Sequence, residues 1–130
     1  MQYMFYEASS FDQDIGNWAV HSVTNMRYMF RGAKKFNQPL NDWRVDKVTR
    51  MDRMFSGAKA FDQDLGWCVD DDVDLDDDVV ELPGAFDETK CASTLCGVVQ
   101  VADAADCPTP ARKYHHPRRD DWLLWLLRAF

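Results

Sequence analysis

The sequence predicts an α/β fold, a short solenoid of strand–helix repeats closed by a Cys-containing C-terminal cap. Three observations predict it: a repeat with a period of 25 residues, a change of apolar spacing within each copy, and four cysteines placed at the end of the last copy and beyond it. A fixed period of this size is typical of solenoids, in which each unit covers the apolar face of its neighbour.

The 25-residue period runs through the first half of the chain. Met4, Met29 and Met54 follow it, and each is followed by Phe. The same step relates three further sets, which are Ala8, Ala33 and Ala58; Phe11, Phe36 and Phe61; and Gln13, Gln38 and Gln63. Trp18 and Trp43 keep the step, whereas Trp67 arrives one residue early. The period predicts an array over residues 1–69 that begins in mid-repeat.

Each copy predicts a short strand followed by a helix. Trp43 and Val45 alternate with polar residues, as in a strand with one buried face. From Val48 the apolar spacing changes to three and four residues, which indicates one face of a helix of about ten residues. Thr49 and Asp52 have the spacing of an N-terminal capping box.

The residues of one copy can be compared with the leucine-rich repeat, Leu-x-x-Leu-x-Leu-x-x-Asn. Leu40, Trp43 and Val45 match its first three positions, and Val48 stands in place of Asn. With the Met-Phe-x-x-Ala-x-x-Phe-Asn/Asp-Gln that follows, the repeat resembles the BspA-like leucine-rich-repeat surface-protein family over about residues 1–69. This resemblance implies a leucine-rich-repeat-like strand–helix solenoid, a cell-surface or secreted location, and binding or adhesion without known catalysis.

Charge divides the chain into three segments. Residues 1–66 carry nine Lys/Arg and eight Asp/Glu, residues 67–111 carry one and twelve, and residues 112–130 carry five and two. The near-neutral array argues against a nucleic-acid partner, which requires a basic face. We therefore expect repeats over 1–69, an acidic, disulfide-bonded cap over 70–107, and a linker with an apolar tail over 108–130. That tail is shorter than the roughly 20 residues of a membrane span, so membrane contact would require a missing or truncated anchor.

The cysteines predict disulfides and an extracellular or cell-surface location. They are Cys68, Cys91, Cys96 and Cys107. Of the three possible pairings, Cys68–Cys91 with Cys96–Cys107 is favoured because it would close the acidic loop onto the last repeat, although the sequence alone does not decide. A zinc site formed by Cys91, Cys96, His115 and His116 is less favoured, since the usual two-residue Cys spacing is absent.

The acidic run can be laid on the twelve-residue calcium loop. Its candidate ligands are Asp70, Asp72, Asp74, Asp76, Asp78 and Glu81, at loop positions 1, 3, 5, 7, 9 and 12. Leu75 stands where the sharp turn requires Gly, which favours a solvated acidic loop instead. Calcium-dependent binding or structure is therefore the second functional hypothesis.

The preferred hypothesis is a non-enzymatic surface protein for protein recognition or adhesion, which needs no cofactor. Positions that vary between copies mark the expected contact residues for a protein or a surface glycan: Ala19, His21, Asn25, Arg31, Arg44, Asp46, Lys47 and Arg50. No Ser/His/Asp or Cys/His set indicates an enzyme. The repeated glutamines are expected to form an amide ladder onto neighbouring loop backbone. Asp12 and Asp14 recur as Asp62 and Asp64 but not in the middle copy, which argues against a repeated acid/base site.

Overall fold

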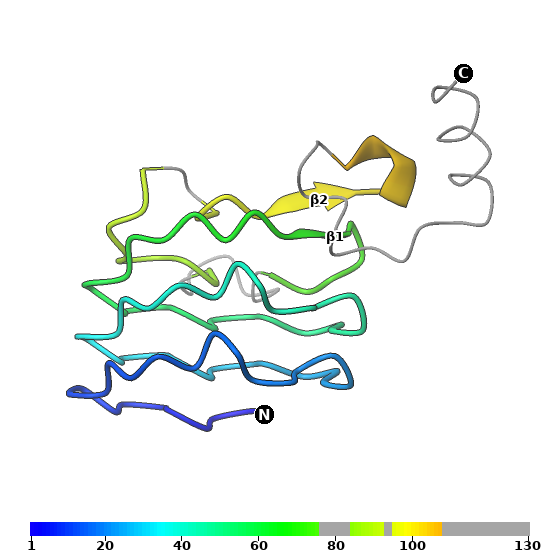
Figure 1. Cartoon of the computed structure of the whole chain (residues 1–130). Coiled ribbons are helices and arrows are strands. Elements are labelled where there is room, and N and C mark those ends of the chain that lie inside the picture. Colours follow the sequence, from blue (N-terminus) through cyan, green and yellow to red (C-terminus); the bar gives the residue numbers. More distant parts are fainter. Residues whose placement is uncertain (76–83, 93–94, 108–130) are drawn as a thin grey trace, which may run out of the picture.

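The computed structural model describes residues 1–75, 84–92 and 95–107. Within them the chain winds in successive coils that lie on one another, from the N-terminus (blue in Figure 1) to the two short strands (green and yellow). Residues 1–25, 26–50 and 51–75 are designated coil 1, coil 2 and coil 3. One sequence period therefore corresponds to one coil.

The predicted strand–helix solenoid is wrong. The described residues contain no α-helix; they contain strand β1 (Cys68–Asp70), strand β2 (Val99–Val101) and a single 3₁₀ turn, η1 (Ala104–Asp106). The two strands are parallel, with Cys68 opposite Val99. No described segment forms a helix with the length and hydropathy needed to cross a membrane.

Backbone hydrogen bonds between coils replace those of the predicted helix. The N–H of Phe5 donates to the carbonyl of Met29 at 2.8 Å, and the N–H of Phe30 donates to that of Met54 at 2.8 Å. In an α-helix the acceptor would be the carbonyl four residues earlier in the same segment. Because these N–H groups are already used between coils, no helical ladder can form in the Met-Phe segment.

Left-handed residues interrupt the same segment in every coil. Tyr3, Tyr28 and Arg53 have φ angles of 59°, 55° and 54°. A helix requires φ near −63°. The predicted capping box is also absent, since the Thr49 hydroxyl donates to the Thr24 carbonyl at 3.2 Å and Asp52 forms ion pairs with arginine. The apolar residues spaced three and four apart therefore lie on irregular backbone and not on a helix.

The residues that recur form the core, as the sequence predicts. Phe30 stacks on Phe5 at 5.4 Å and on Phe55 at 5.1 Å between ring centroids, and Phe55 stacks on Phe86 at 5.5 Å. Residues 84–92 therefore extend the packing of coil 3. The largest fully buried side chains are Trp43, Trp67, Phe30, Phe36, Phe55, Phe61, Met26, Met29, Leu40, Met51, Met54 and Leu65.

Polar side chains also repeat their contacts from coil to coil. The indole N–H of Trp43 donates to the Ile15 carbonyl at 3.0 Å, and that of Trp67 to the Leu40 carbonyl at 3.1 Å despite its early position. The Gln63 amide donates to the carbonyl and side chain of Asn37, at 3.3 and 2.8 Å. Gln38 makes the equivalent bonds to Asp12, which confirms the amide ladder.

Both disulfides are present, but the favoured pairing is wrong. The bonds join Cys68 to Cys107 and Cys91 to Cys96, with Cα–Cα distances of 5.9 and 5.2 Å. Parallel pairing of β1 with β2 brings the segment that follows β2, and with it Cys107, back beside Cys68, whereas Cys91 and Cys96 close a short local loop. Neither disulfide leaves a thiolate for the zinc site, and His115 and His116 lie outside the described residues.

Candidate functional site

The residues expected to contact a partner divide between two parts of the coil. Ala19, His21, Arg44 and Lys47 are exposed and Asp46 is half-buried, in the segments that follow Trp18 and Trp43. Asn25, Arg31 and Arg50 belong to the part that carries the ladder between coils, where single parallel bridges join Asn25 to Arg50 and Arg50 to Asp74. Several aromatic residues lie close to this second group.

Tyr28 is the centre of a cluster that we name the Arg–Tyr face. The face consists of Tyr3, Tyr6, Arg27, Tyr28, Arg31 and Arg53. The guanidinium carbons of Arg27, Arg53 and Arg31 lie 5.0, 5.5 and 5.8 Å from the centroid of the Tyr28 ring. The Tyr3 ring stacks on Tyr28 at 4.8 Å with an interplanar angle of 5°. Rigid aromatic rings and arginines thus share one surface.

The repeat explains why these side chains meet. Tyr3, Tyr28 and Arg53 occupy the same position in three successive coils, so the stack places them in one column. Their left-handed backbone costs roughly 1–2 kcal/mol per residue. Ring stacking and cation–π contacts, worth about 0.5–1.5 kcal/mol each, offset part of that cost. The Tyr28 hydroxyl also accepts a hydrogen bond from Arg53 Nη1 at 3.2 Å.

A buried carboxylate forms ion pairs with two neighbouring arginines. Asp52 has only 1% of its surface exposed; it accepts a short hydrogen bond from Arg27 and lies 3.5 Å from Nε of Arg50. Arg50 also pairs with Asp74 at 3.5 Å. The hydrogen bond to Asp52 raises the pKa of the Arg27 guanidinium above its ordinary value. Arg31 differs, because no carboxylate of the described residues forms an ion pair with it.

The exposed large hydrophobic side chains of the described residues lie on coil 1, and three of the four are aromatic. The exposed fractions are 49% for Tyr3, 41% for Tyr6, 50% for Met4 and 39% for Trp18. The tyrosines were not among the expected contact residues, although both of their repeat positions vary between copies. Tyr3 and Tyr28 are replaced by Arg53 in coil 3, and Tyr6 stands where coil 2 has Arg31.

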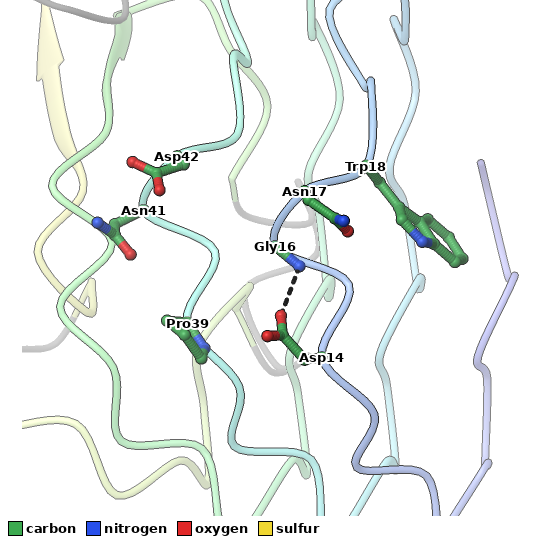
Figure 2. A pocket seen from close by; sticks show the side chains of 7 residues that line it. All are labelled: Asp14, Gly16, Asn17, Trp18, Pro39, Asn41 and Asp42. Carbon is green, nitrogen blue, oxygen red and sulfur yellow. Dashed lines mark hydrogen bonds between the residues drawn. The ribbon is translucent and has the colours of Figure 1, made fainter.

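A shallow hollow of about 440 Å³ lies between coils 1 and 2 (Figure 2). It is lined by Asp14, Gly16, Asn17, Trp18, Pro39, Asn41 and Asp42. Asp14 turns toward the backbone and accepts the Gly16 N–H at 3.0 Å, while the Trp18 ring points away from Asn41 and Asp42 (Figure 2). Asp64 repeats this turn with Gly66 at 3.1 Å, so this carboxylate position stabilises turns.

Three of the six proposed calcium ligands lie within the described residues. Asp70 and Asp72 are exposed, and Asp74 pairs with Arg50. Asp76, Asp78 and Glu81 lie outside the described residues. Within the described residues, no group of three His, Cys, Asp or Glu side chains is placed to hold a metal ion. Calcium binding by the whole run stays a prediction.

Fold and surface together define a repeat protein of stacked 25-residue coils with an arginine- and tyrosine-rich face. Residues 1–89 match the family model described as Mycoplasma protein of unknown function, DUF285. This match spans 89 of the 130 residues, and the chain belongs to that family. It includes all three coils and residues 84–89, which pack on coil 3. No curated protein and no solved structure matches the chain.

Proposed function

We propose that this protein is a non-enzymatic cell-surface or secreted protein of the BspA-like leucine-rich-repeat kind, which recognises another protein through the Arg–Tyr face. The observation that carries the proposal is the convergence of three guanidinium groups on Tyr28, beside the exposed rings of Tyr3 and Tyr6. Arginine and tyrosine are enriched among the residues that contribute most to protein–protein binding. The stacked coils hold these side chains in place before a partner arrives, which lowers the entropy cost of binding.

The cysteine chemistry supports a location outside the cytosol. All four cysteines are paired in disulfides, which persist mainly in oxidising compartments. The resemblance to BspA-like surface proteins points the same way. Surface display would expose the Arg–Tyr face to extracellular partners.

The calcium hypothesis receives less support. Asp74, the third candidate ligand, already pairs with Arg50. If calcium organised residues 70–81, the melting temperature would rise with calcium, and Asp72→Ala would abolish that rise. We expect instead the same melting temperature with and without calcium, for the wild type and for Asp72→Ala.

A binding comparison tests the recognition proposal. Labelled wild-type protein is applied to a panel of extracellular proteins, alongside a Tyr3→Ser/Tyr6→Ser variant and a Lys34→Ser/Lys35→Ser control. All four changed residues are exposed, so each variant should fold. We expect saturable binding to a protein target, weakened about tenfold or more by the tyrosine changes and unchanged in the control. Absence of saturable binding, or equal binding by the tyrosine variant, would contradict the proposal.

A further inference from the structure

The arginines in and beside the Arg–Tyr face differ in how their charge is balanced. Asp52 forms ion pairs with Arg27 and Arg50, and Asp74 forms a second ion pair with Arg50. Arg31 has no such partner among the described residues. Unlike Arg27 and Arg50, Arg31 therefore has a charge that an acidic ligand can pair with.

Aromatic rings hold the Arg31 side chain in position. Its guanidinium carbon lies 5.6 Å from the Tyr6 ring centroid and 5.8 Å from that of Tyr28. Nη1 lies 3.5 Å from the Tyr6 hydroxyl oxygen, at the outer limit of a hydrogen bond. The Arg31 carbonyl accepts the Glu7 N–H at 2.7 Å, which fixes its backbone against coil 1. A guanidinium carries five N–H donors, so most of them remain for a ligand.

The nearby Glu7 carboxylate does not form an ion pair that would balance the charge of Arg31. The Glu7 side chain lies over Gly32, so closely that a Cβ at Gly32 would come within 2.6 Å of its carboxylate carbon. Glu7 is nevertheless not in ion-pair contact with Arg31. Arg31 thus presents a positioned, half-buried guanidinium beside the exposed rings of Tyr3 and Tyr6.

We propose that Arg31 is an anion-binding residue of the Arg–Tyr face, and that its ligand is an Asp or Glu side chain in an acidic segment of the partner protein. This inference rests on the proposed recognition function. The planar guanidinium fork matches a carboxylate in a bidentate manner. Residues 1–66 are near neutral, with nine Lys/Arg and eight Asp/Glu, so the face lacks the broad basic surface that a long polyanion such as a sulfated glycan requires. One guanidinium is sufficient to pair with a carboxylate of a short acidic peptide. The tyrosine rings then contact the apolar parts of the same segment.

The probe for this proposal is a short fluorescent poly-glutamate peptide, titrated with the purified chain at low and physiological salt. We expect binding that weakens with salt. Arg31→Gln should weaken it by about ten- to a hundredfold, which is the loss of one charge-assisted contact. Arg31→Lys should be intermediate, because it keeps the charge without the fork. Thermal unfolding of both variants verifies that they are folded.

Lys59→Gln is the matched control. It removes one positive charge at an exposed residue of coil 3 that belongs neither to the Arg–Tyr face nor to the expected contact residues. This change should alter peptide affinity less than about twofold. Equal binding by wild type and Arg31→Gln, or binding of heparin but not of poly-glutamate, would overturn the acidic-segment proposal. If the Tyr3→Ser/Tyr6→Ser variant still bound the protein target more weakly than the wild type, protein recognition by the Arg–Tyr face would stand without an acidic ligand for Arg31.

Discussion

Coils 1 and 2 carry the same repeat residues in different environments. Trp18 is 39% exposed whereas Trp43 is fully buried, and Met4 is 50% exposed whereas Met29 is fully buried. Coil 2 is covered on both sides, by coils 1 and 3, whereas coil 1 contacts a described coil on one side only. The comparison shows that burial in this fold depends on a neighbouring coil as well as on the residue. The same type of side chain is core in one copy and exposed surface in another.

Replacing the tryptophans tests this difference with the largest expected effect. Trp43→Ala removes a fully buried ring, its hydrogen bond to the Ile15 carbonyl and its stacking on Trp67. We expect a loss of about 3–5 kcal/mol in the free energy of unfolding, measured by urea denaturation. Trp18→Ala should cost about 1 kcal/mol, since the ring is partly in water already. Similar losses for the two variants would show that cover by a neighbouring coil does not set the contribution of these tryptophans to stability.

Removing each disulfide compares a long closed loop with a short one. The Cys68–Cys107 bond spans 39 residues and the Cys91–Cys96 bond spans five. Loop-closure entropy predicts losses of about 4 and about 2 kcal/mol when each pair is changed to Ala. Urea denaturation under non-reducing conditions measures both. A larger loss for the short loop would show that local contacts, and not chain entropy, set the contribution.

The glutamine ladder gives the smallest expected difference. Gln63 donates to Asn37 of coil 2, whereas Gln13 of coil 1 is exposed. Gln63→Ala should cost about 1 kcal/mol and Gln13→Ala less than about 0.5 kcal/mol. Thermal unfolding of the two variants side by side measures this. An equal cost would mean that the amide bonds to the preceding coil do not contribute to stability.

Sequence periodicity predicts the core better than it predicts the backbone. Met29, Phe30 and Phe36 are buried as the period indicates, because stacking requires recurring apolar residues whatever the local conformation. The helix prediction failed because apolar spacing does not reveal where N–H groups donate. Tyr28 and Arg53 adopt left-handed backbone, which neither residue type signals. The alternation Trp43–Arg44–Val45 did predict burial correctly, although no strand forms there.

The candidate site was predictable only in part. Variation between copies pointed to Arg31 and Arg50, and both lie in or beside the Arg–Tyr face. Tyr28 was not predicted, although its repeat position changes to Arg53 in the third coil. The disulfide pairing also required the structure, because it depends on the register of β1 with β2 and not on loop length.

The Met-Phe segment forms its backbone hydrogen bonds between coils and not within a helix. Through-hydrogen-bond NMR couplings test it directly at the amide nitrogen of Phe30. The structure predicts a coupling to the carbonyl carbon of Met54, in the next coil. A coupling to the carbonyl carbon of Met26, the helical partner four residues earlier, would contradict it.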